Sequence, residues 1–209
     1  MGLLIKQVKS LKLPFLDEMS TQQRDPFKVL VSCILSLRTQ DKTTSGASQR
    51  LYRLASTPDG IASLKVNAIQ KAIYPVGFYR VKAQRIKELS KTLIEDYEGK
   101  VPDTIAELLK LRGVGRKTAN LVVTLGWNKP GICVDTHVHR ITNRLGYIKT
   151  KTPEQTEFAL REKLPRRYWK EINGLLVAFG QNICKPISPL CTQCSIFHSC
   201  ERVGVSRYR

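Results

Sequence analysis

Hydrophobic residues recur at helical spacing along most of the chain. The clearest case is the segment from Lys82 to Tyr97, where apolar residues return at positions 83, 86, 89, 93, 94 and 97. The segment from Phe27 to Leu37 is apolar on nearly every side, which predicts a helix buried at the centre of a domain. Few segments alternate with a period of two, so we predict an all-α fold.

Capping and turn residues suggest where the helices begin and end. Asp25 followed by Pro26 is an N-cap with proline at the first helical position, and Asp41 can cap a second helix that runs to Leu54. Gly99 ends the helix that contains Tyr97. Further helices are expected at residues 61–64, 67–73, 104–111, 117–125 and 137–145, from 152 onward, and at 168–181.

The composition is that of a globular, strongly basic protein. The chain has 209 residues, of which 42% are hydrophobic and 25% charged. We expect it to be soluble and intracellular, since it has neither a membrane-length apolar run nor a signal peptide at its start. Lys and Arg number 35 against 17 Asp and Glu, a net charge of +18. This charge favours nucleic acid as partner, and acidic lipid ranks lower because the basic residues are scattered through helical patterns.

The segment Leu111–Ala119 reads Leu-Arg-Gly-Val-Gly-Arg-Lys-Thr-Ala. Two glycines one residue apart are expected to let the chain reverse between two helices where a side chain would clash. The N-terminus of the second helix, with basic side chains around it, predicts a phosphate grip that does not read sequence. An ordinary tight turn is the alternative. The residues concerned are Arg112, Gly113, Gly115, Arg116 and Lys117.

The six cysteines fall into two groups. Cys33 and Cys133 each lie alone in apolar surroundings and are interpreted as buried free thiols. The other four crowd near the end of the chain, at Cys184, Cys191, Cys194 and Cys200. In an intracellular protein such a cluster indicates metal rather than disulfides. Zinc is the usual metal for four cysteines, but it favours two close pairs, and here one close pair is flanked by longer gaps.

In the order and spacing of these motifs, the chain resembles the endonuclease III branch of the helix-hairpin-helix DNA glycosylases. That family has a lysine at the position of Lys117, a Val-Asp-Thr-His signature, here Val134–His137, and four cysteines spaced as in this chain. The resemblance implies a six-helix barrel at 21–130 that holds the hairpin at 111–119. It also implies a second helical domain, formed by 1–20 and 131–209, with a 4Fe-4S cluster on the four cysteines and zinc as the runner-up.

The resemblance implies a base-excision-repair glycosylase with AP lyase activity that removes oxidised pyrimidines of the thymine glycol type. An amine that attacks C1′ forms a Schiff base and permits elimination of the 3′ phosphate, provided that the amine is neutral. The first turn of a helix and the neighbouring arginines would favour a neutral Lys117. Asp135 would hold the positive charge of the reacting sugar, although its position before a helix also suits a plain N-cap.

Removal of a base requires that it leave the stack, and side chains then fill the gap. The family uses a Gln near the end of its first long helix and a Leu in a Gly-Leu-Tyr loop. This chain has Arg38 and Phe78 at those positions, with Gln40 as a substitute for the Gln. Plain core packing of Phe78 is the alternative. Lys185, together with Arg202 and Arg207, is expected to lie on a loop braced by the cluster and to face phosphate.

Two other functions stay open at this point: a thymine mismatch glycosylase acting on G·T or G·U pairs, and a non-catalytic helix-hairpin-helix module. An iron–sulfur electron carrier would not need a charge of +18. The expected partner is double-stranded DNA with a damaged base or an abasic site, bound by a monomer and without a membrane. The expected location is the cytoplasm and nucleoid of a prokaryote, or the nucleus or an organelle of a eukaryote.

Overall fold

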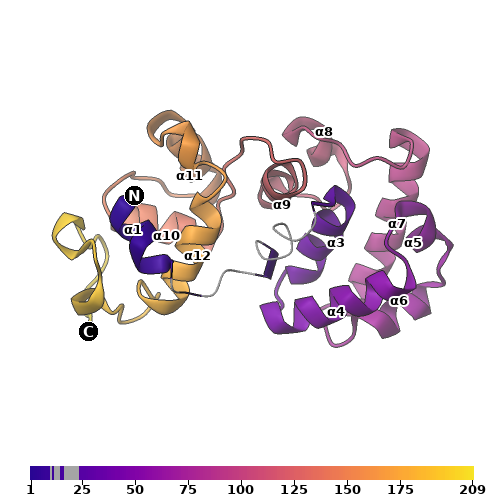
Figure 1. Ribbon diagram of the computed structural model, residues 1–209, viewed down its shortest axis with the longest axis horizontal. Coiled ribbons are helices and arrows are strands. Elements are labelled where there is room, and N and C mark those ends of the chain that lie inside the picture. Colours follow the sequence, from indigo (N-terminus) through magenta and orange to yellow (C-terminus); the bar gives the residue numbers. More distant parts are fainter. Residues whose placement is uncertain (10, 12–14, 17–23) are drawn as a thin grey trace. The chain divides into compact units, whose positions relative to one another are not determined.

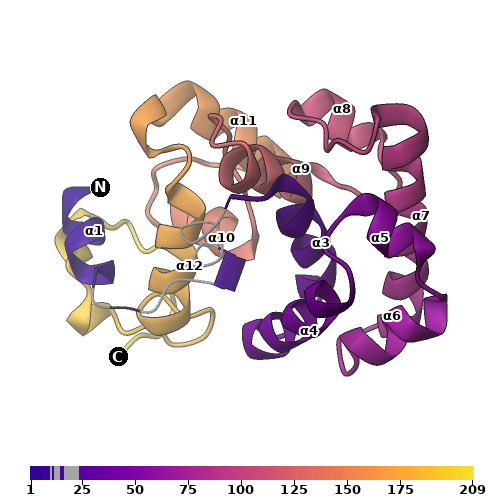
Figure 2. The same cartoon turned by 45° about the vertical axis from the view of Figure 1, so that its right-hand side comes forward.

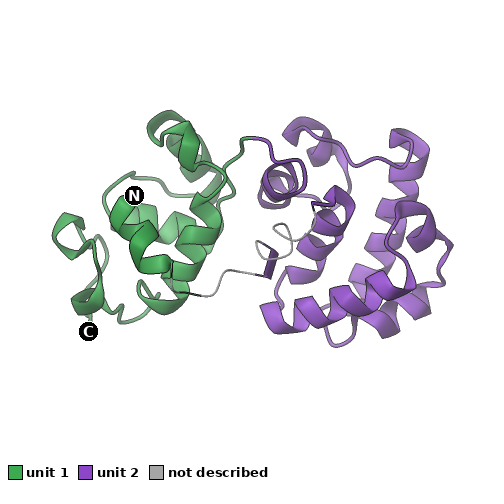
Figure 3. Ribbon diagram, viewed as in Figure 1, with its two compact units in different colours: residues 1–14, 130–209 green, residues 15–129 purple. Residues whose placement is uncertain are grey.

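The computed structural model describes residues 1–9, 11, 15–16 and 24–209 (Figure 1). These residues form helices joined by loops, with no strand among them, and the prediction of an all-α fold is confirmed. The chain divides into two compact units, residues 15–129 and residues 1–14 with 130–209 (Figure 3). The expected boundary between residues 20 and 21 lies outside the described residues, so the predicted domain limits stay a prediction.

Helix α3 (Pro26–Ser36) is the centre of the 15–129 unit. It begins at Asp25, whose Oδ1 accepts hydrogen bonds from the backbone N–H groups of Phe27 and Lys28 at 3.0 Å. Its side chains are buried on nearly every side, as the sequence predicts. It contacts α4, α7, α9 and η1. Helix α4 spans Asp41–Leu54, α7 spans Tyr79–Tyr97, α9 spans Arg116–Leu121, and η1 is the π-helical turn Val122–Gly126.

Two short helices of this unit lie against α7. Helices α5 (Pro58–Ser63) and α6 (Val66–Ile73) both pack against the long helix α7 (Figure 2). Burial of apolar side chains from every helix holds the unit together. The largest fully buried ones here are Leu30, Ile34, Leu35, Leu51, Ile61, Ile69, Ile73, Ile86, Leu93, Leu108 and Leu111.

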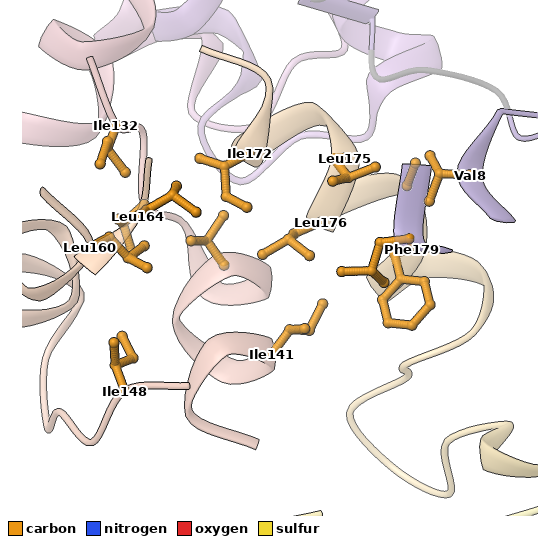
Figure 4. Close-up of a cluster of buried hydrophobic side chains, with 14 residues drawn as sticks. Val8, Ile132, Ile141, Ile148, Leu160, Leu164, Ile172, Leu175, Leu176 and Phe179 are labelled. Atoms are coloured by element: carbon orange, nitrogen blue, oxygen red, sulfur yellow. The ribbon is translucent and has the colours of Figure 1, made fainter. Parts of the chain in front are cut away.

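The other unit is built around α12 (Ile172–Asn182). Helix α12 packs against α1 (Gly2–Val8) and α10 (Thr136–Arg144), and α10 also contacts α11 (Pro153–Lys163). Figure 4 shows the apolar side chains of α12 between those of α10 and α1. A single 3-10 turn at Arg166–Tyr168 precedes α12, and two more follow it, at Cys191–Gln193 and Phe197–Ser199.

Several helix ends differ from the prediction. Helix α4 has Gln40 at its N-cap, so Asp41 is its first residue and not its cap. Helix α7 begins at Tyr79, before the expected Lys82, and α12 begins at Ile172 rather than 168 because a 3-10 turn precedes it. The helix expected over 117–125 stays α-helical only to 121. Its last turn is a π-helix, where the Thr124 hydroxyl donates to the Asn120 carbonyl at 2.8 Å.

Within the part of the chain that the structure describes, no helix combines the length and the apolar character needed to cross a membrane.

Candidate functional site

The hairpin at 111–119 joins two short helices of the 15–129 unit. Helix α8 (Ile105–Lys110) is capped by Thr104, whose hydroxyl accepts from the backbone N–H of Glu107 at 3.3 Å. Leu111 and Val114 are buried, and the Val114 N–H donates to the Leu111 carbonyl at 3.0 Å. These two apolar side chains anchor the turn, so the residues between and after them face outward.

The two positions of the hairpin that hold glycine differ in whether the structure requires one. Gly113 has φ +83°, a conformation that disfavours any side chain, and a Cβ there would lie 2.8 Å from the side chain of Arg85. Gly115 has φ −97° and ψ 174°, which any residue adopts, and a Cβ there would meet nothing within 4 Å. The expectation that a side chain would clash is therefore wrong for Gly115. Its missing side chain leaves the start of α9 open.

The basic side chains of the hairpin are accessible. The Arg112 side chain is 89% exposed and lies 3.6 Å from the Glu88 carboxylate. Arg116 is half-buried, whereas Lys117, in the first turn of α9, is exposed. Among the described residues, the Lys117 side chain has no hydrogen-bond or ion-pair partner. An amine without a partner can reach a ligand at no cost in broken contacts.

Asp135 is the N-cap of α10, in the unit that contains residues 130–209. Its Oδ1 accepts from the backbone N–H groups of His137 at 2.8 Å and Val138 at 2.9 Å. The cap expected for this position is thus present. The Oδ2 atom accepts no hydrogen bond from the part of the chain that the structure describes. The cap bonds therefore fix the orientation of the carboxylate and leave Oδ2 available to a ligand.

The two histidines beside Asp135 have partners within their own unit. Arg140 donates to Nδ1 of His137 at 3.2 Å, and His139 Nδ1 lies 2.7 Å from the Thr156 hydroxyl. The backbone N–H of His137 also belongs to the Asp135 cap. The His139 contact joins α10 to α11, and the His137 contact lies within α10.

The four clustered cysteines line one pocket at the end of the chain. Cys184, Cys191, Cys194 and Cys200 all contribute to its wall. Burial, followed by the neighbouring thiols, raises the pKa of Cys191, and burial also raises the pKa of Cys194. Four thiolates here would repel one another, so they need a positive group between them. Among the described residues, no three His, Cys, Asp or Glu side chains converge on a single metal position.

The last turn of α10 is bonded to the cysteine loop. The buried guanidinium of Arg144 donates to the carbonyls of Lys185 at 2.8 Å and Pro186 at 3.1 Å, and it lies 3.4 Å from the Cys184 sulfur. The Cys200 thiol faces the Arg144 carbonyl at 3.7 Å. Arg144 was not expected from the sequence, where it is one of many basic residues on helices.

Other basic residues of the cysteine loop differ in what they can reach. The backbone of Lys185 accepts from Arg144, while the residue itself is half-buried. Arg202 lies over the Phe197 ring at 4.5 Å and donates to the Phe197 carbonyl at 3.1 Å. Its guanidinium therefore contacts the loop itself, although the sequence suggested phosphate. Arg207 is exposed.

The residues expected to fill the gap in DNA lie on two loops of the 15–129 unit. Phe78 is 63% exposed with φ +58°, so the alternative of core packing is wrong. Arg38 is exposed with φ +54°, and its guanidinium lies 5.8 Å from the centre of the Phe78 ring. Gln40 is exposed, and its carbonyl starts α4. The structure thus brings Arg38 and Phe78 together.

The comparison with protein families matches residues 31–166 to the HhH-GPD superfamily of base excision DNA repair proteins. The chain is 52% identical to endonuclease III of Thermotoga maritima, over 86% of this chain and 84% of that protein. It is 49% identical to endonuclease III-like protein 1 of Bos taurus over 80% of this chain, which spans only 56% of that longer protein.

Two solved structures are similar over nearly the whole chain. One is a trapped endonuclease III–DNA covalent intermediate, with a TM-score of 0.80, 34% identity, and coverage of 90% of this chain and 92% of that one. The other is a thermostable thymine-DNA glycosylase, with a TM-score of 0.84, 25% identity, and coverage of 96% and 93%. The chain therefore belongs to the HhH-GPD superfamily of base excision DNA repair proteins and, within it, to the endonuclease III family.

Proposed function

We propose that this protein removes oxidised pyrimidines of the thymine glycol type from double-stranded DNA, with Lys117 as nucleophile and Asp135 as its partner. As a member of the endonuclease III family the protein is a base-excision DNA glycosylase with AP lyase activity. The lesion class, the reacting residues and the residues that contact DNA are the parts that we propose. Family membership also argues against a non-catalytic DNA-binding module.

In the proposed reaction the lone pair of the Lys117 amine attacks C1′ of the damaged nucleotide. The bond between C1′ and the base breaks, and the base leaves with the electron pair and then takes a proton. The sugar ring then opens as O4′ takes a proton from water, which gives a protonated imine between Nζ and C1′. Loss of a proton from C2′ then expels the 3′ phosphate, which cuts the strand. The exposed position of Lys117 at the start of α9 supports this assignment.

The proposed part of Asp135 is electrostatic. Positive charge grows on the sugar as the bond to the base breaks, and a fixed carboxylate stabilises it without reorganisation. The cap bonds of Oδ1 fix the carboxylate, and Oδ2 is the oxygen that would face the sugar. In this proposal one residue serves both as cap and as catalyst.

Binding of DNA is assigned to the hairpin and to the two loops that carry Arg38 and Phe78. The open backbone at Gly115 and the exposed Arg112 suit a phosphate, and Gly113 makes the turn possible. Arg116 and Lys185 would add phosphate contacts. Phe78, Arg38 and Gln40 would occupy the space left by the extruded base. If excision of a paired lesion by Phe78→Ala equalled that of the wild type, Phe78 would have no such part.

The four cysteines are proposed to hold a 4Fe-4S cluster, and they fit such a group because all four line one pocket. The cluster would supply the positive core that four thiolates require, and its contribution would be structural. Arg144 keeps the first cysteine in place through its bonds to residues 185 and 186. Zinc is the alternative occupant.

The observation that carries the proposal is the exposed amine of Lys117, without a partner among the described residues, at the hairpin of an endonuclease III family member. The test is incubation with duplexes that carry thymine glycol, a G·T mismatch, adenine opposite 8-oxoguanine, or an abasic site. Cleavage at thymine glycol and at the abasic site is the expected result. Absence of cleavage at thymine glycol would contradict the proposed lesion class.

A thymine mismatch glycosylase is the second candidate. The similarity to a thermostable thymine-DNA glycosylase favours it, as do Arg38 and Phe78 in place of the residues usual in the endonuclease III branch. Activity on the G·T duplex alone, in the same set of incubations, would establish this candidate instead.

A further inference from the structure

Lys82 is a buried lysine that the proposed reaction does not use. It lies in the first turn of α7 and is 5% exposed. Its ammonium donates to the carbonyls of Leu35 at 2.8 Å and Leu37 at 2.5 Å, and to the Thr39 hydroxyl at 3.3 Å. All three donors of the ammonium therefore have acceptors, and all the acceptors belong to the end of α3 and the loop after it.

The loop that Lys82 holds is interlocked with the turn before α7. The Thr39 hydroxyl also accepts from the backbone N–H of Gly77 at 3.2 Å. A Cβ on Gly77 would lie 2.7 Å from the Arg38 carbonyl, so only glycine permits this approach of the two backbones. Thr39 is thus the point where the α3–α4 loop, the turn at 77–78 and the Lys82 ammonium meet.

The residues next to these contacts are the two proposed to enter DNA. Arg38 and Phe78 both have a left-handed backbone, with φ +54° and φ +58°, which is unfavourable for residues other than glycine. Such conformations persist where the surrounding structure fixes them. Here the fixing contacts are those of Lys82, Thr39 and Gly77, all within the 15–129 unit.

We propose that Lys82 is a positioning residue, which binds the α3–α4 loop to the start of α7 and so holds Arg38 and Phe78 as one rigid probe of the base pair. The inference rests on the proposed function. An apolar side chain would fill this buried position without the cost of removing a charge from water. Three directed donors, however, fix the path of a loop in a way that apolar contacts do not.

The test separates removal of a paired base from cleavage at a site that has already lost its base. Lys82→Met keeps most of the volume and removes all three donors. Excision of thymine glycol from a duplex should fall roughly tenfold in kcat/KM, while cleavage at a preformed abasic site should stay within about twofold of the wild type. Lys82→Arg retains donors and should recover part of the loss.

A second readout does not depend on chemistry. A 2-aminopurine opposite the lesion gains fluorescence when it loses its stacking partner, and this gain on binding should be reduced for Lys82→Met. Lys87→Met is the matched control, since Lys87 lies on the same helix and donates to the Leu64 carbonyl, away from both loops. All variants are compared well below their unfolding temperatures.

Thr39→Val provides an independent variant if Lys82→Met does not fold. It removes the hydroxyl shared by Lys82 and Gly77 and should give the same separation of the two activities, more weakly. Equal losses on both substrates, no loss on either, or the same separation for Lys87→Met would overturn the inference. A wild type that cuts neither substrate would instead overturn the proposed function, and this inference with it.

Discussion

The carboxylate of Asp135 has two separable properties, its hydrogen bonds and its charge. The cap uses one oxygen as an acceptor from two backbone N–H groups. An asparagine at this position can keep the cap because its amide oxygen accepts in the same way. The charge, in contrast, is needed only for the proposed stabilisation of the sugar. Substitutions at this one residue can therefore distinguish a structural part from a catalytic one.

Asp135→Asn should lose most base excision while DNA affinity is retained. Its free energy of unfolding should stay within about 1 kcal/mol of the wild type, whereas Asp135→Ala should lose the cap as well. Thermal unfolding, a lesion excision assay and DNA titration measure the three quantities. An Asp135→Asn enzyme with normal excision would reduce Asp135 to a cap.

The hairpin glycines allow a comparison between folding and binding. Gly113→Ala should destabilise the protein by more than about 1 kcal/mol, because alanine disfavours φ +83°. Gly115→Ala should leave stability nearly unchanged, since its φ is ordinary and the space is open, but should weaken DNA binding. Urea unfolding and DNA titration separate the two effects. Similar losses of stability for both variants would contradict this assignment.

The protonation of Lys82 should make the stability of the fold depend on pH. Burial, and secondly Arg85, lowers the pKa of Lys82 from its ordinary 10.5 to about 8. Between pH 8 and 10.5 the unfolded chain binds more protons at this lysine than the folded protein does. The free energy of unfolding should therefore rise with pH in this range.

The measurement is the difference in unfolding free energy between the wild type and Lys82→Met, from pH 7 to 10. The difference should shift in favour of the wild type as the pH rises above about 8. A difference that is constant with pH, or that shifts the other way, would show that the folded protein keeps this lysine protonated.

At the scale of helices, α10 links two parts of its unit. Asp135 caps its first turn, and Arg144 in its last turn is bonded to the cysteine loop. Arg140, between them, donates to the Cys184 carbonyl at 2.8 Å, and burial lowers its pKa. The cysteine loop is therefore fixed to the same helix that orients the proposed catalytic carboxylate.

The identity of the group on the cysteines can be tested on protein purified without oxygen. We expect four irons and four sulfides per chain and a broad absorption band at about 400 nm. Arg144→Met should lose this band in air faster than the wild type does, because the carbonyls of residues 185 and 186 then lack the guanidinium that donates to them. If the purified protein contained stoichiometric zinc and no iron, the four cysteines would form a zinc site and not a cluster site.

Periodicity predicted the helices more reliably than it predicted their ends. The buried helix α3 follows directly from its uninterrupted apolar run and its Asp25 cap. The start of α7 was missed because its first residues, Tyr79 to Val81, place no buried apolar side chain on the core face, and Phe78 before them has a left-handed backbone. The π-helical turn after α9 was missed because the residues at 122–126 would suit an α-helix equally well.

For the whole molecule, the net charge of +18 should attract DNA phosphates, and each phosphate that is contacted should add to the salt dependence of binding. The logarithm of the DNA association constant should fall linearly with the logarithm of salt concentration. Arg112→Gln should reduce that slope by roughly 1, because one phosphate contact is lost. Lys110→Gln is a control in the adjoining helix α8, where Lys110 forms an ion pair with Glu107 at 2.6 Å. Equal slopes for the wild type and Arg112→Gln would remove Arg112 from the interface.

The candidate site could be predicted from sequence wherever it depends on a local motif. The hairpin, the Val-Asp-Thr-His segment and the four cysteines are each short enough to be found directly. Lys82 and Arg144 could not be found in this way, because each acts on backbone groups more than 40 residues away. One signal was present for Lys82: it occupies the same face of α7 as the buried Ile86 and Leu89.

The proposed covalent bond between the Lys117 amine and the sugar can be trapped. Borohydride reduction during reaction with abasic DNA converts an imine into a stable protein–DNA adduct. The wild type and Arg112→Gln should give the adduct, and Lys117→Gln should give none although it still binds DNA. An adduct of undiminished yield with Lys117→Gln would contradict the account, because another amine would then be the nucleophile.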